Sequence, residues 1–532
     1  MSNIHPAPRA QLLREIDQTP VWDVVVIGGG ATGLGTAVDA AARGYRTLLV
    51  EARDFAKGTS SKATKLVHGG VRYLAQGNIS LVREALRERG LLARNAPHVV
   101  GKLGFVVPAY RRRDKPFYGA GLKLYDWLAG SLNLSPSREL GIAETQALLP
   151  TLTNTLQDRP LRGAMLYYDG QFDDARLAIS LMRTVFDLGG IALNNAAVRA
   201  IHADTATRQH TLCIEDVETG SQFNVRSRCV INATGVWVDS IRAMVEPAVQ
   251  PIVAPSQGVH LTLPARFLQS DHAILVPRTD DGRVLFVVPW HGHTIIGTTD
   301  TPRADMPFDP NASEQDVDFI LRTAARYLST PPTRSDVLSV WAGLRPLVKR
   351  DTKAATSSLS REHTLESHPD GMITVTGGKW TTYRRMAEEV IDLAISTGLL
   401  PAAPCRTETL ALHGAKPADG AANEISRTGS AARCYGSDAA SIAHLPGADR
   451  VLIPASGLTE AHVRYAAQAE LARSVEDVLA RRNRALFLDA RAACDAAPEV
   501  ARILAEELNH DTHWQAREVA AFTTFASGWQ LR

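Results

Sequence analysis

Three glycines near the start of the chain have the spacing of a turn that binds phosphate. The segment reads Gly28-Gly-Gly30-Ala-Thr-Gly33 and lies between an apolar run and an Ala-rich, helix-like stretch. Such a turn lets backbone approach a pyrophosphate, and the N-terminus of the following helix offers N–H groups to it. Glu51 ends the next apolar run, where an acid can accept hydrogen bonds from a ribose. Together these residues predict a dinucleotide site.

Two later segments have the same strand–turn–helix character. They are residues 229–237, which end in Asn-Ala-Thr-Gly-Val-Trp, and residues 373–382, which contain a glycine pair. Reduced flavin carries negative charge near N1, and Lys379 with a helix N-terminus at Thr381 would stabilise that charge. Three such junctions far apart in the sequence fit one extended cofactor, so the residues favour FAD over NAD.

A block rich in hydroxyl, glycine and basic residues follows the second apolar run. It reads Thr59-Ser-Ser-Lys-Ala-Thr-Lys-Leu-Val-His-Gly-Gly-Val-Arg-Tyr73. Its small hydroxyl groups suit pyrophosphate and flavin edges, and its glycine pair allows backbone to lie beside an isoalloxazine ring. Arg72 and, much later, Arg345 are forked cations that match the oxygens of a phosphate ester.

The elements that must bring these segments together predict an α/β protein with a discontinuous, Rossmann-like FAD-binding domain. Strand-like runs between the glycine junctions predict a β-rich substrate domain, and the Ala/Arg/Glu-rich tail predicts a helical C-terminal domain. The expected divisions are 1–90, 155–250 and 340–400 for the FAD-binding domain, 91–154 and 251–339 for the substrate domain, and 405–532 for the helical domain.

Composition excludes several other classes. The chain has 532 residues and a formal net charge of +2, so its bulk charge does not indicate nucleic acid as a partner. Five scattered cysteines without a CxxC pair argue against a disulfide framework and a zinc site, and we expect no metal. We expect no signal peptide, and no apolar run approaches the ~20 residues of a membrane helix. Membrane contact would therefore be peripheral.

Segments spread over the whole chain also match one enzyme family. They are Gly28–Gly33 with Glu51, and residues 59–73, 173–176, 232–237, 296–300, 343–346, 377–384 and 472–481. With these segments the chain resembles the FAD-dependent glycerol-3-phosphate dehydrogenases of the D-amino-acid-oxidase-like flavoprotein superfamily. The match covers nearly the whole chain from Asp23, and the 59–73 block is far more specific than GxGxxG.

The resemblance implies a function and a set of site residues. The reaction would be oxidation of sn-glycerol 3-phosphate to dihydroxyacetone phosphate by hydride transfer to FAD, with the electrons passed to a membrane quinone. The implied catalytic residues are His260, Arg345 and Lys379, and the implied substrate-binding residues are Arg72, Tyr73 and Arg361. The residues assigned to the cofactor are Gly28, Gly30, Gly33, Glu51, Thr59, Ser60, Ser61, Lys65, His68, Gly69, Gly70, Ala233, Thr234, Gly235, Gly377, Gly378 and Thr381.

Some assignments stay open at this point. The base that takes the C2 hydroxyl proton is either His260 or absent, with Arg345 or Lys379 stabilising the alkoxide instead. Each residue also has a purely structural alternative role. Arg361 could be a solvated loop residue, His260 a hydrogen-bonded histidine within a strand, and Arg72 and Arg345 could form ion pairs with acidic residues. A glycerophosphate oxidase that uses oxygen, an amine or 2-hydroxy-acid oxidase, and a redox-sensing flavoprotein without turnover are the rival functions.

A lipid-soluble quinone predicts docking on a membrane. We expect a cytoplasmic protein attached peripherally to the inner face of the cell membrane, and a homodimer is left open. Two stretches are candidates for docking. One is Arg111–Lys115 leading into Phe117–Leu134, although we expect Phe117–Leu134 mainly to pack in the core. The other is Lys379–Leu400, where cations precede an apolar-rich helix.

Overall fold

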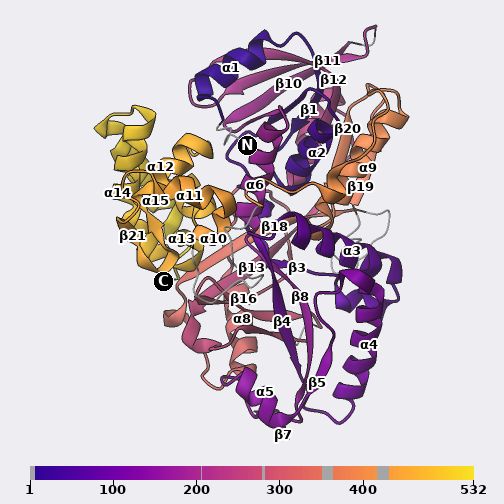
Figure 1. Cartoon of the computed structure of the whole chain (residues 1–532), viewed down its shortest axis with the longest axis vertical. Coiled ribbons are helices and arrows are strands. Elements are labelled where there is room, and N and C mark those ends of the chain that lie inside the picture. Colours follow the sequence, from indigo (N-terminus) through magenta and orange to yellow (C-terminus); the bar gives the residue numbers. More distant parts are fainter. Residues whose placement is uncertain are drawn as a thin grey trace.

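The chain folds around two large β-sheets, with a group of helices attached to one side (Figure 1). The structure, a computed structural model, describes residues 6–204, 206–277, 279, 282–349, 363–415 and 431–531, apart from the side chains of 72, 75, 76, 431 and 432. This architecture confirms the predicted α/β class with a β-rich part and a helical C-terminal part.

The first sheet carries the glycine junctions. Its central strand β1 lies parallel to β2 on one side and to β12 on the other, and β20 lies parallel to β12. Strand β1 is almost wholly buried, as expected for a parallel sheet that is covered on both faces. The strands of this sheet are β1 (Trp22–Ile27), β2 (Thr47–Val50), β9 (Ile191–Leu193), β10 (Ala196–Asp204), β11 (Gln209–Asp216), β12 (Gln222–Asn232), β19 (His363–Ser367) and β20 (Ile373–Gly377).

Helix α2 is almost wholly buried. It packs against both α6 and α9, and its alanines and glycines permit that close approach. The helices around the first sheet are α1 (Arg9–Gln18), α2 (Ala31–Ala42), α6 (Asp174–Asp187), α7 (Val238–Val245) and α9 (Tyr383–Ser396).

The second sheet is mostly antiparallel and lies below the first in Figure 1. Helices α3 and α4 flank it at the right of that view. Its strands are β3 (Leu66–Val67), β4 (Val100–Pro108), β5 (Arg138–Leu140), β8 (Ala164–Phe172), β13 (Val253–Pro264), β14 (His272–Val276), β15 (Leu285–Trp290), β16 (His293–Gly297), β17 (Thr301–Pro302) and β18 (Ser339–Val348). The helices of this half are α3 (Ile79–Asn95), α4 (Asp114–Ala129), α5 (Ile142–Leu148) and α8 (Glu314–Tyr327), and a small hairpin consists of β6 (Thr155–Leu156) and β7 (Arg159–Pro160).

Strand pairing moves two of the expected domain boundaries. Strand β8 pairs with β4, and β18 pairs with β13, so both strands belong to the second sheet. We had expected residues 155–250 and 340–400 to lie wholly in the FAD-binding domain. The expectation failed there because glycine turns mark only where cofactor strands end, and pairing between distant strands leaves no local signal. With these corrections the division into domains remains our proposal.

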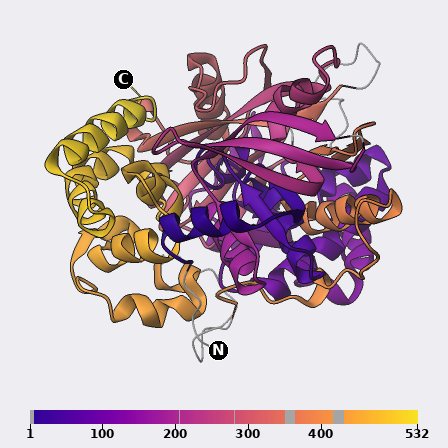
Figure 2. The same ribbon diagram turned by 90° about the horizontal axis from the view of Figure 1, so that it is seen from above.

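The C-terminal residues form a helical unit, drawn in orange and yellow, whose apolar core also includes Trp290, Ile295 and Trp341 of the second sheet (Figures 1 and 2). Figure 2 shows this unit beside the sheets rather than between them. Its helices are α10 (Ala431–Tyr435), α11 (Ala439–Ala443), α12 (Glu460–Ala469), the π-helical turn η12 (Asp477–Arg482), α13 (Ala485–Leu488), α14 (Ala490–Leu508) and α15 (Thr512–Ser527). A short hairpin consists of β21 (Val451–Ile453) and β22 (Leu458–Thr459).

Candidate active site

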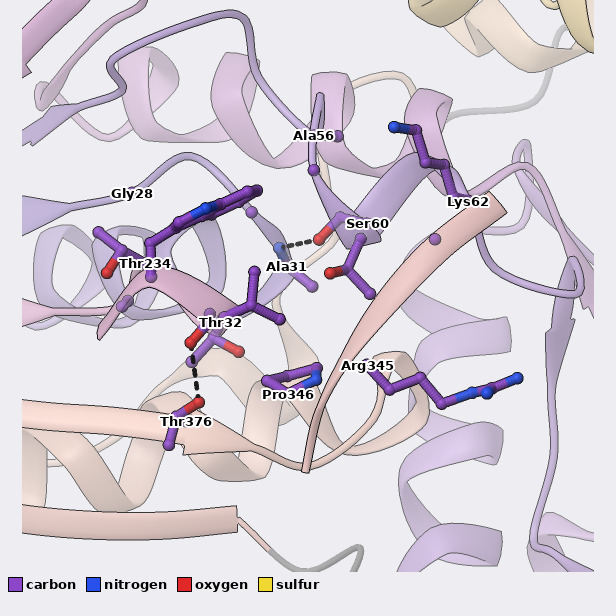
Figure 3. Close-up of a pocket in the computed structure, with 18 of the residues that line it drawn as sticks. Gly28, Ala31, Thr32, Ala56, Ser60, Lys62, Thr234, Arg345, Pro346 and Thr376 are labelled. Atoms are coloured by element: carbon purple, nitrogen blue, oxygen red, sulfur yellow. Dashed lines mark hydrogen bonds between the residues drawn. The ribbon is translucent and has the colours of Figure 1, made fainter. Parts of the chain in front are cut away.

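A cavity of about 570 Å³ is lined by residues of both sheets. At the first sheet its wall includes Gly28 and Ala196, and at the second sheet it includes His260 and Arg345. Figure 3 shows Gly28 and Thr234 on one side of the view and Arg345 on the other. The fold therefore brings the three glycine junctions and two of the cations, Arg345 and Lys379, to a single cavity.

The glycine turn after β1 has no room for side chains. Gly28 has φ of +110°, and a Cβ on it would lie 2.7 Å from the carbonyl oxygen of Ala233. A Cβ on Gly33 would lie 1.9 Å from the carbonyl oxygen of Gly28. These contacts explain why the motif needs glycine, since backbone of one junction touches backbone of the next. Gly33 serves this packing and does not itself line the cavity.

Glu51 lies at the end of β2 and lines the same cavity. Its Oε2 accepts a hydrogen bond from Gly29 N at 2.6 Å, and its Oε1 accepts one from Arg53 N at 2.8 Å. Burial raises the pKa of Glu51, while these two backbone donors oppose the rise. The carboxylate thus holds the glycine turn in place beside the position where a ribose would lie.

The Thr59–Ser61 turn, η1, sits on the N-terminus of α2. Ser60 Oγ accepts a hydrogen bond from Ala31 N at 2.9 Å, a contact drawn in Figure 3. The carbonyl of Ser60 accepts one from Trp380 Nε1 at 2.8 Å, and Thr59 Oγ1 donates to Leu344 O at 2.5 Å. This turn therefore connects the N-terminus of α2 to Trp380 and to Leu344 of β18. The N-terminus of a helix is the place where an anionic phosphate is best stabilised.

His260 is held rigidly on β13. Its ring stacks on Trp341 with centroids 5.3 Å apart, and its Nε2 lies 2.9 Å from Thr64 Oγ1. Gly297 on the neighbouring strand allows this placement, since a Cβ there would lie 2.2 Å from the His260 ring. Burial, helped by the charges of Lys65 and Arg345, lowers the pKa of His260 well below its usual value. The imidazole is therefore neutral.

Arg345 lies on β18, the strand that pairs with β13, and is opposite Ser256. Its Nη1 is 3.1 Å from Asp300 Oδ1, and its Nη2 donates to Thr298 Oγ1 at 3.0 Å and to Thr299 O at 2.9 Å. A Cβ on Gly258 would lie 2.3 Å from Nη2, so the guanidinium lies flat on the glycine backbone. Arg345 therefore does pair with an acidic residue, as the structural alternative expected. The same side chain also lines the cavity.

Lys379 and Tyr73 form a second cationic contact in the cavity wall. The Lys379 ammonium lies 4.3 Å from the centroid of the Tyr73 ring. Lys379 directly precedes the turn η8 (Trp380–Thr382), which leads into α9. This places a cation and a helix entry on the same wall, which is the arrangement expected to stabilise negative charge on a flavin.

Most residues assigned from the sequence line this cavity. Those that do are Gly28, Gly30, Glu51, Thr59, Ser60, His68, Tyr73, Ala233, Thr234, Gly235, His260, Arg345, Gly377, Gly378, Lys379 and Thr381. Those that do not are Gly33, Ser61, Lys65, Gly69 and Gly70. The side chain of Arg72 and the whole of Arg361 lie outside the described residues, so their roles stay predictions.

Lys65 and Gly69 point away from the cavity for identifiable reasons. The Lys65 ammonium is fully buried and bonded to both oxygens of Asp174, at 2.9 and 2.7 Å. Its backbone has φ of +65°, which turns the side chain into the protein interior. Gly69 N donates to Tyr125 OH at 2.8 Å. Spacing in the 59–73 block could not distinguish residues that face the cofactor from residues that anchor the block.

Sequence reasoning missed several residues of the wall. Lys62 lines the cavity and donates to Phe308 O at 3.2 Å, and Trp237 stacks on Phe308 with centroids 4.2 Å apart. Thr64 was noted only as a hydroxyl donor, although it is the hydrogen-bond partner of His260. The Thr-Ser-Ser-Lys-Ala-Thr run contained Lys62 and Thr64, but Phe308 lies in a loop without any motif.

One group of side chains bears on the expectation that no metal is bound. Ligand atoms of Asp173, His291 and Cys434 lie within 4.8 Å of one another. Asp173 is already the N-cap of α6, accepts from Arg176 N at 3.1 Å, and lies 3.8 Å from Arg484 Nε. Burial raises the pKa of the Cys434 thiol to about 12. The absence of a metal stays a prediction.

The residues present fit FAD. Gly28 forms a cradle that a Cβ would fill, and an α-helix begins at Ala31, next to the hydroxyl of Ser60. The cavity continues from there to a cationic and histidine-lined end in the second sheet. When bound there, the pyrophosphate would lie on the glycine turn, with Glu51 at the ribose and Lys379 near the flavin.

Comparisons with known proteins agree with this geometry. A family model described as FAD dependent oxidoreductase matches residues 23–393. A second model, described as the C-terminal domain of alpha-glycerophosphate oxidase, matches residues 405–515. The two matches follow the division seen in the structure between the two sheets and the helical tail.

Individual relatives match over most of their length. The mitochondrial glycerol-3-phosphate dehydrogenase of Mus musculus is 38% identical over 98% of this chain and 75% of the relative. That of Arabidopsis thaliana is 40% identical over 93% of this chain and 84% of the relative. The crystal structure of the glycerol-3-phosphate dehydrogenase from Bacillus halodurans, complexed with FAD, has a TM-score of 0.77 and 28% identity, and the match covers 98% of each chain.

Proposed function

Because the chain belongs to the family of FAD-dependent glycerol-3-phosphate dehydrogenases, we propose that it oxidises sn-glycerol 3-phosphate to dihydroxyacetone phosphate. The observation that carries the proposal is the meeting of two cations, Arg345 and Lys379, with the neutral imidazole of His260 in the wall of the dinucleotide cavity. Oxidation of an alcohol that carries a phosphate ester needs cations to bind the phosphate and a group that can accept the hydroxyl proton. FAD supplies the acceptor for the two electrons that the substrate loses.

Two cations would bind and orient the substrate. Arg345 is held by Asp300 and Thr298, so its guanidinium is positioned before substrate arrives. The ammonium of Lys379 contacts the ring of Tyr73. A preorganised cation loses little conformational entropy when it binds phosphate, and it can stabilise negative charge that develops during oxidation.

His260 would hold the proton that leaves the C2 hydroxyl. Its Nδ1 is buried and makes no hydrogen bond to any residue in the described part of the chain, so it is closed to the substrate. The proton would therefore pass to Nε2, which lies 2.9 Å from Thr64 Oγ1 in the cavity wall. The low pKa makes His260 a weak base in the empty site, and the negative charge of a bound phosphate raises its proton affinity. Substrate binding and base strength are thereby linked.

The electron acceptor in this proposal is a membrane quinone, reached through peripheral docking. No helix in the described ranges is long and apolar enough to cross a membrane. Helix α4 has a buried side, with Tyr125 and Leu122, and an exposed side on which Trp127 and Phe117 are 75% and 68% exposed. Exposed aromatic rings on an amphipathic helix favour the interface of a bilayer.

Basic residues next to α4 support the same surface. An open hollow beside the helix is lined by Arg111, Arg112, Lys115, Lys123, Arg138 and Arg162, with Glu139 as its acid. Cations near an anionic surface contribute about 1 kcal/mol each. We call α4 with this hollow the docking surface, and we propose that it contacts the anionic face of the membrane.

The other candidate stretch, Lys379–Leu400, receives no support. In α9, Val390 and Ile391 are fully buried in the core of the first sheet. Arg384 is buried as well, and its guanidinium is bonded to Glu88 at 2.7 Å. The apolar side of α9 and the cation Arg384 both make contacts inside the protein, so neither is available to a membrane. The cytoplasmic location and a homodimer stay predictions.

The proposal is tested by turnover of the purified holoenzyme with sn-glycerol 3-phosphate and a soluble quinone analogue. We expect dihydroxyacetone phosphate to form in step with quinone reduction, and little oxygen to be consumed. Oxygen uptake with peroxide formation would assign the oxidase function instead. No product from a preparation with full FAD content would contradict the proposed substrate, and amine or 2-hydroxy-acid substrates would then be assayed.

A further inference from the structure

The loop after β2 carries the residues that face the pyrophosphate, and the helical C-terminal unit holds this loop from behind. We call residues 52–65 the cofactor loop. Lys57, Thr59 and Ser60 of this loop line the cavity. Among the described residues, none beyond Thr381 lines it, so the C-terminal unit does not face the cofactor itself. On the far side of the loop it nevertheless makes several ion pairs with loop residues.

The first anchor is Asp54 at the start of the loop. Asp54 is 3% exposed and forms ion pairs with Arg481 and Arg482 of η12, which are also buried. Burial alone would raise the pKa of Asp54, but the two guanidinium groups outweigh it and lower the pKa. A buried carboxylate of this kind is stable only while its partners are in place. The start of the loop therefore depends on η12.

The second anchor is at Ser61, the last residue of the turn that meets the α2 N-terminus. Arg484 Nη2 donates to Ser61 O at 2.8 Å and lies 3.2 Å from Asp174 Oδ1. Lys65 Nζ donates to the same Ser61 carbonyl at 2.7 Å. One backbone carbonyl thus receives two buried cations, one from the loop and one from the C-terminal unit.

The third anchor lies between these two. Lys57 Nζ is 2.6 Å from Glu476 Oε2, and Glu476 Oε1 is 2.6 Å from Arg481 Nη1. Lys57 also lies 3.6 Å from Asp309 Oδ2, next to Phe308 in the cavity wall. The C-terminal segment 476–484 therefore contacts the cofactor loop at its beginning, middle and end.

We propose that the C-terminal helical unit acts as a clamp that retains FAD, with Arg481, Arg482 and Arg484 as positioning residues. They hold the cofactor loop against the N-terminus of α2, where Ser60 meets Ala31. When the clamp is loosened, the loop gains freedom and the dinucleotide dissociates faster. The segment 472–481, which matched the enzyme family without an assigned role, leads into this clamp. The inference does not depend on which substrate the enzyme oxidises.

A purely structural role is the alternative, and a matched pair of variants separates the two. Arg484→Lys keeps the charge but cannot reach Ser61, Asp174 and Ala480 together. Arg473→Lys is the control, because Arg473 also joins the C-terminal unit to the first sheet, with two 2.7 Å bonds to Glu218. That contact lies on the β11–β12 turn, away from the cofactor loop.

The measurement is FAD binding rather than turnover. FAD release from each holoenzyme is followed by flavin fluorescence after dilution, and the Kd is obtained by titrating apo-protein with FAD. We expect Arg484→Lys to raise the Kd about tenfold, with kcat restored by excess FAD. Arg473→Lys should leave the Kd unchanged. The rise in unfolding temperature on adding FAD should shrink only for Arg484→Lys.

Equal FAD affinity in Arg484→Lys and Arg473→Lys would overturn the clamp, whatever happens to their stability. Because Arg484 is buried and its variant can fail to fold, Arg481→Lys provides a second test at the Asp54 anchor. It should also raise the Kd for FAD. An unchanged Kd in a folded Arg481→Lys protein would overturn the proposal as well.

Discussion

Arg345 and Asp300 form an ion pair in the wall of the cavity, with Nη1 of the guanidinium 3.1 Å from Oδ1 of the carboxylate. Asp300 is itself 6% exposed and accepts a short hydrogen bond from Ser256. The carboxylate therefore has a fixed position, and it fixes the plane of the guanidinium. A cation held in this way is ready to bind a phosphate without rearrangement.

Replacing Arg345 by Ala should weaken substrate use far more than cofactor binding. A hydrogen bond to a charged group contributes about 1.5–3 kcal/mol, so kcat/KM for sn-glycerol 3-phosphate should fall about ten- to a hundredfold. Arg345→Lys should recover only part of this, because an ammonium cannot fork. Steady-state kinetics with a flavin-to-protein ratio for each variant checks this. An unchanged kcat/KM at normal flavin content would remove Arg345 from the site.

Gly28→Ala should abolish tight FAD binding, because the new Cβ would lie 2.7 Å from the carbonyl oxygen of Ala233. Gly44→Ala is the matched control, since Gly44 also has positive φ, of +93°, but nothing lies within 4 Å of its would-be Cβ. The control should show only backbone strain of about 1–2 kcal/mol and should keep its flavin. The flavin-to-protein ratio after gel filtration decides. Full flavin content in Gly28→Ala would contradict the claim that FAD binding requires glycine at position 28.

His260 should make the folded protein sensitive to acid. Burial, with the charges of Lys65 and Arg345, lowers the pKa of His260 in the folded state, whereas an unfolded histidine titrates near about 6.5. Below that pH the unfolded state therefore takes up a proton that the folded state does not, and stability falls as the pH falls. The loss is about 1.4 kcal/mol per pH unit for one proton.

The comparison is between wild type and His260→Gln, because the other buried histidines are common to both. Unfolding temperatures between pH 7 and pH 5.5 should fall more steeply for the wild type. Parallel curves for the two proteins would show that His260 titrates normally in the folded state.

Membrane binding should depend on the exposed side of α4. Phe117→Glu with Trp127→Glu should reduce co-sedimentation with anionic liposomes, and Arg111→Glu with Arg112→Glu should reduce it in a salt-dependent way. The control is Val451→Glu, since Val451 is 53% exposed on the C-terminal unit. Binding that is equal in all variants would show that another surface docks. Loss in the control as well would indicate that charge alone controls the interaction.

The local parts of the fold were accessible from the sequence. Strand β1, helix α2 and strand β2 follow directly from the apolar runs and the glycine turn, because each is determined by residues within a few positions. Cavity positions were predicted in the same way, since a glycine that ends a parallel strand lies at the edge where cofactors bind. His260 entered through the resemblance, whereas Arg345 and Lys379 were also singled out as cations, and all three line the same cavity.

Other features depend on contacts between distant segments and had no local signal. Strand β18 joins the second sheet because it pairs with β13 about eighty positions earlier, so its domain was assigned incorrectly. The spacing suggested that Lys65 binds the cofactor, yet its ammonium forms an ion pair with Asp174 in the protein interior. Phe117 and Trp127 were expected mainly in the core, and the structure leaves both exposed because Tyr125 and Leu122 take the buried side of α4.

The central claim is that this cavity lets sn-glycerol 3-phosphate reduce the bound flavin, and an anaerobic titration of the holoenzyme tests it without any acceptor. The absorbance of oxidised FAD should bleach with one equivalent of sn-glycerol 3-phosphate, and the product should be dihydroxyacetone phosphate. Glycerol lacks the phosphate that we propose Arg345 and Lys379 bind, so it should reduce the flavin far more slowly. A flavin that stays oxidised with sn-glycerol 3-phosphate, or that bleaches equally fast with glycerol, would contradict the account.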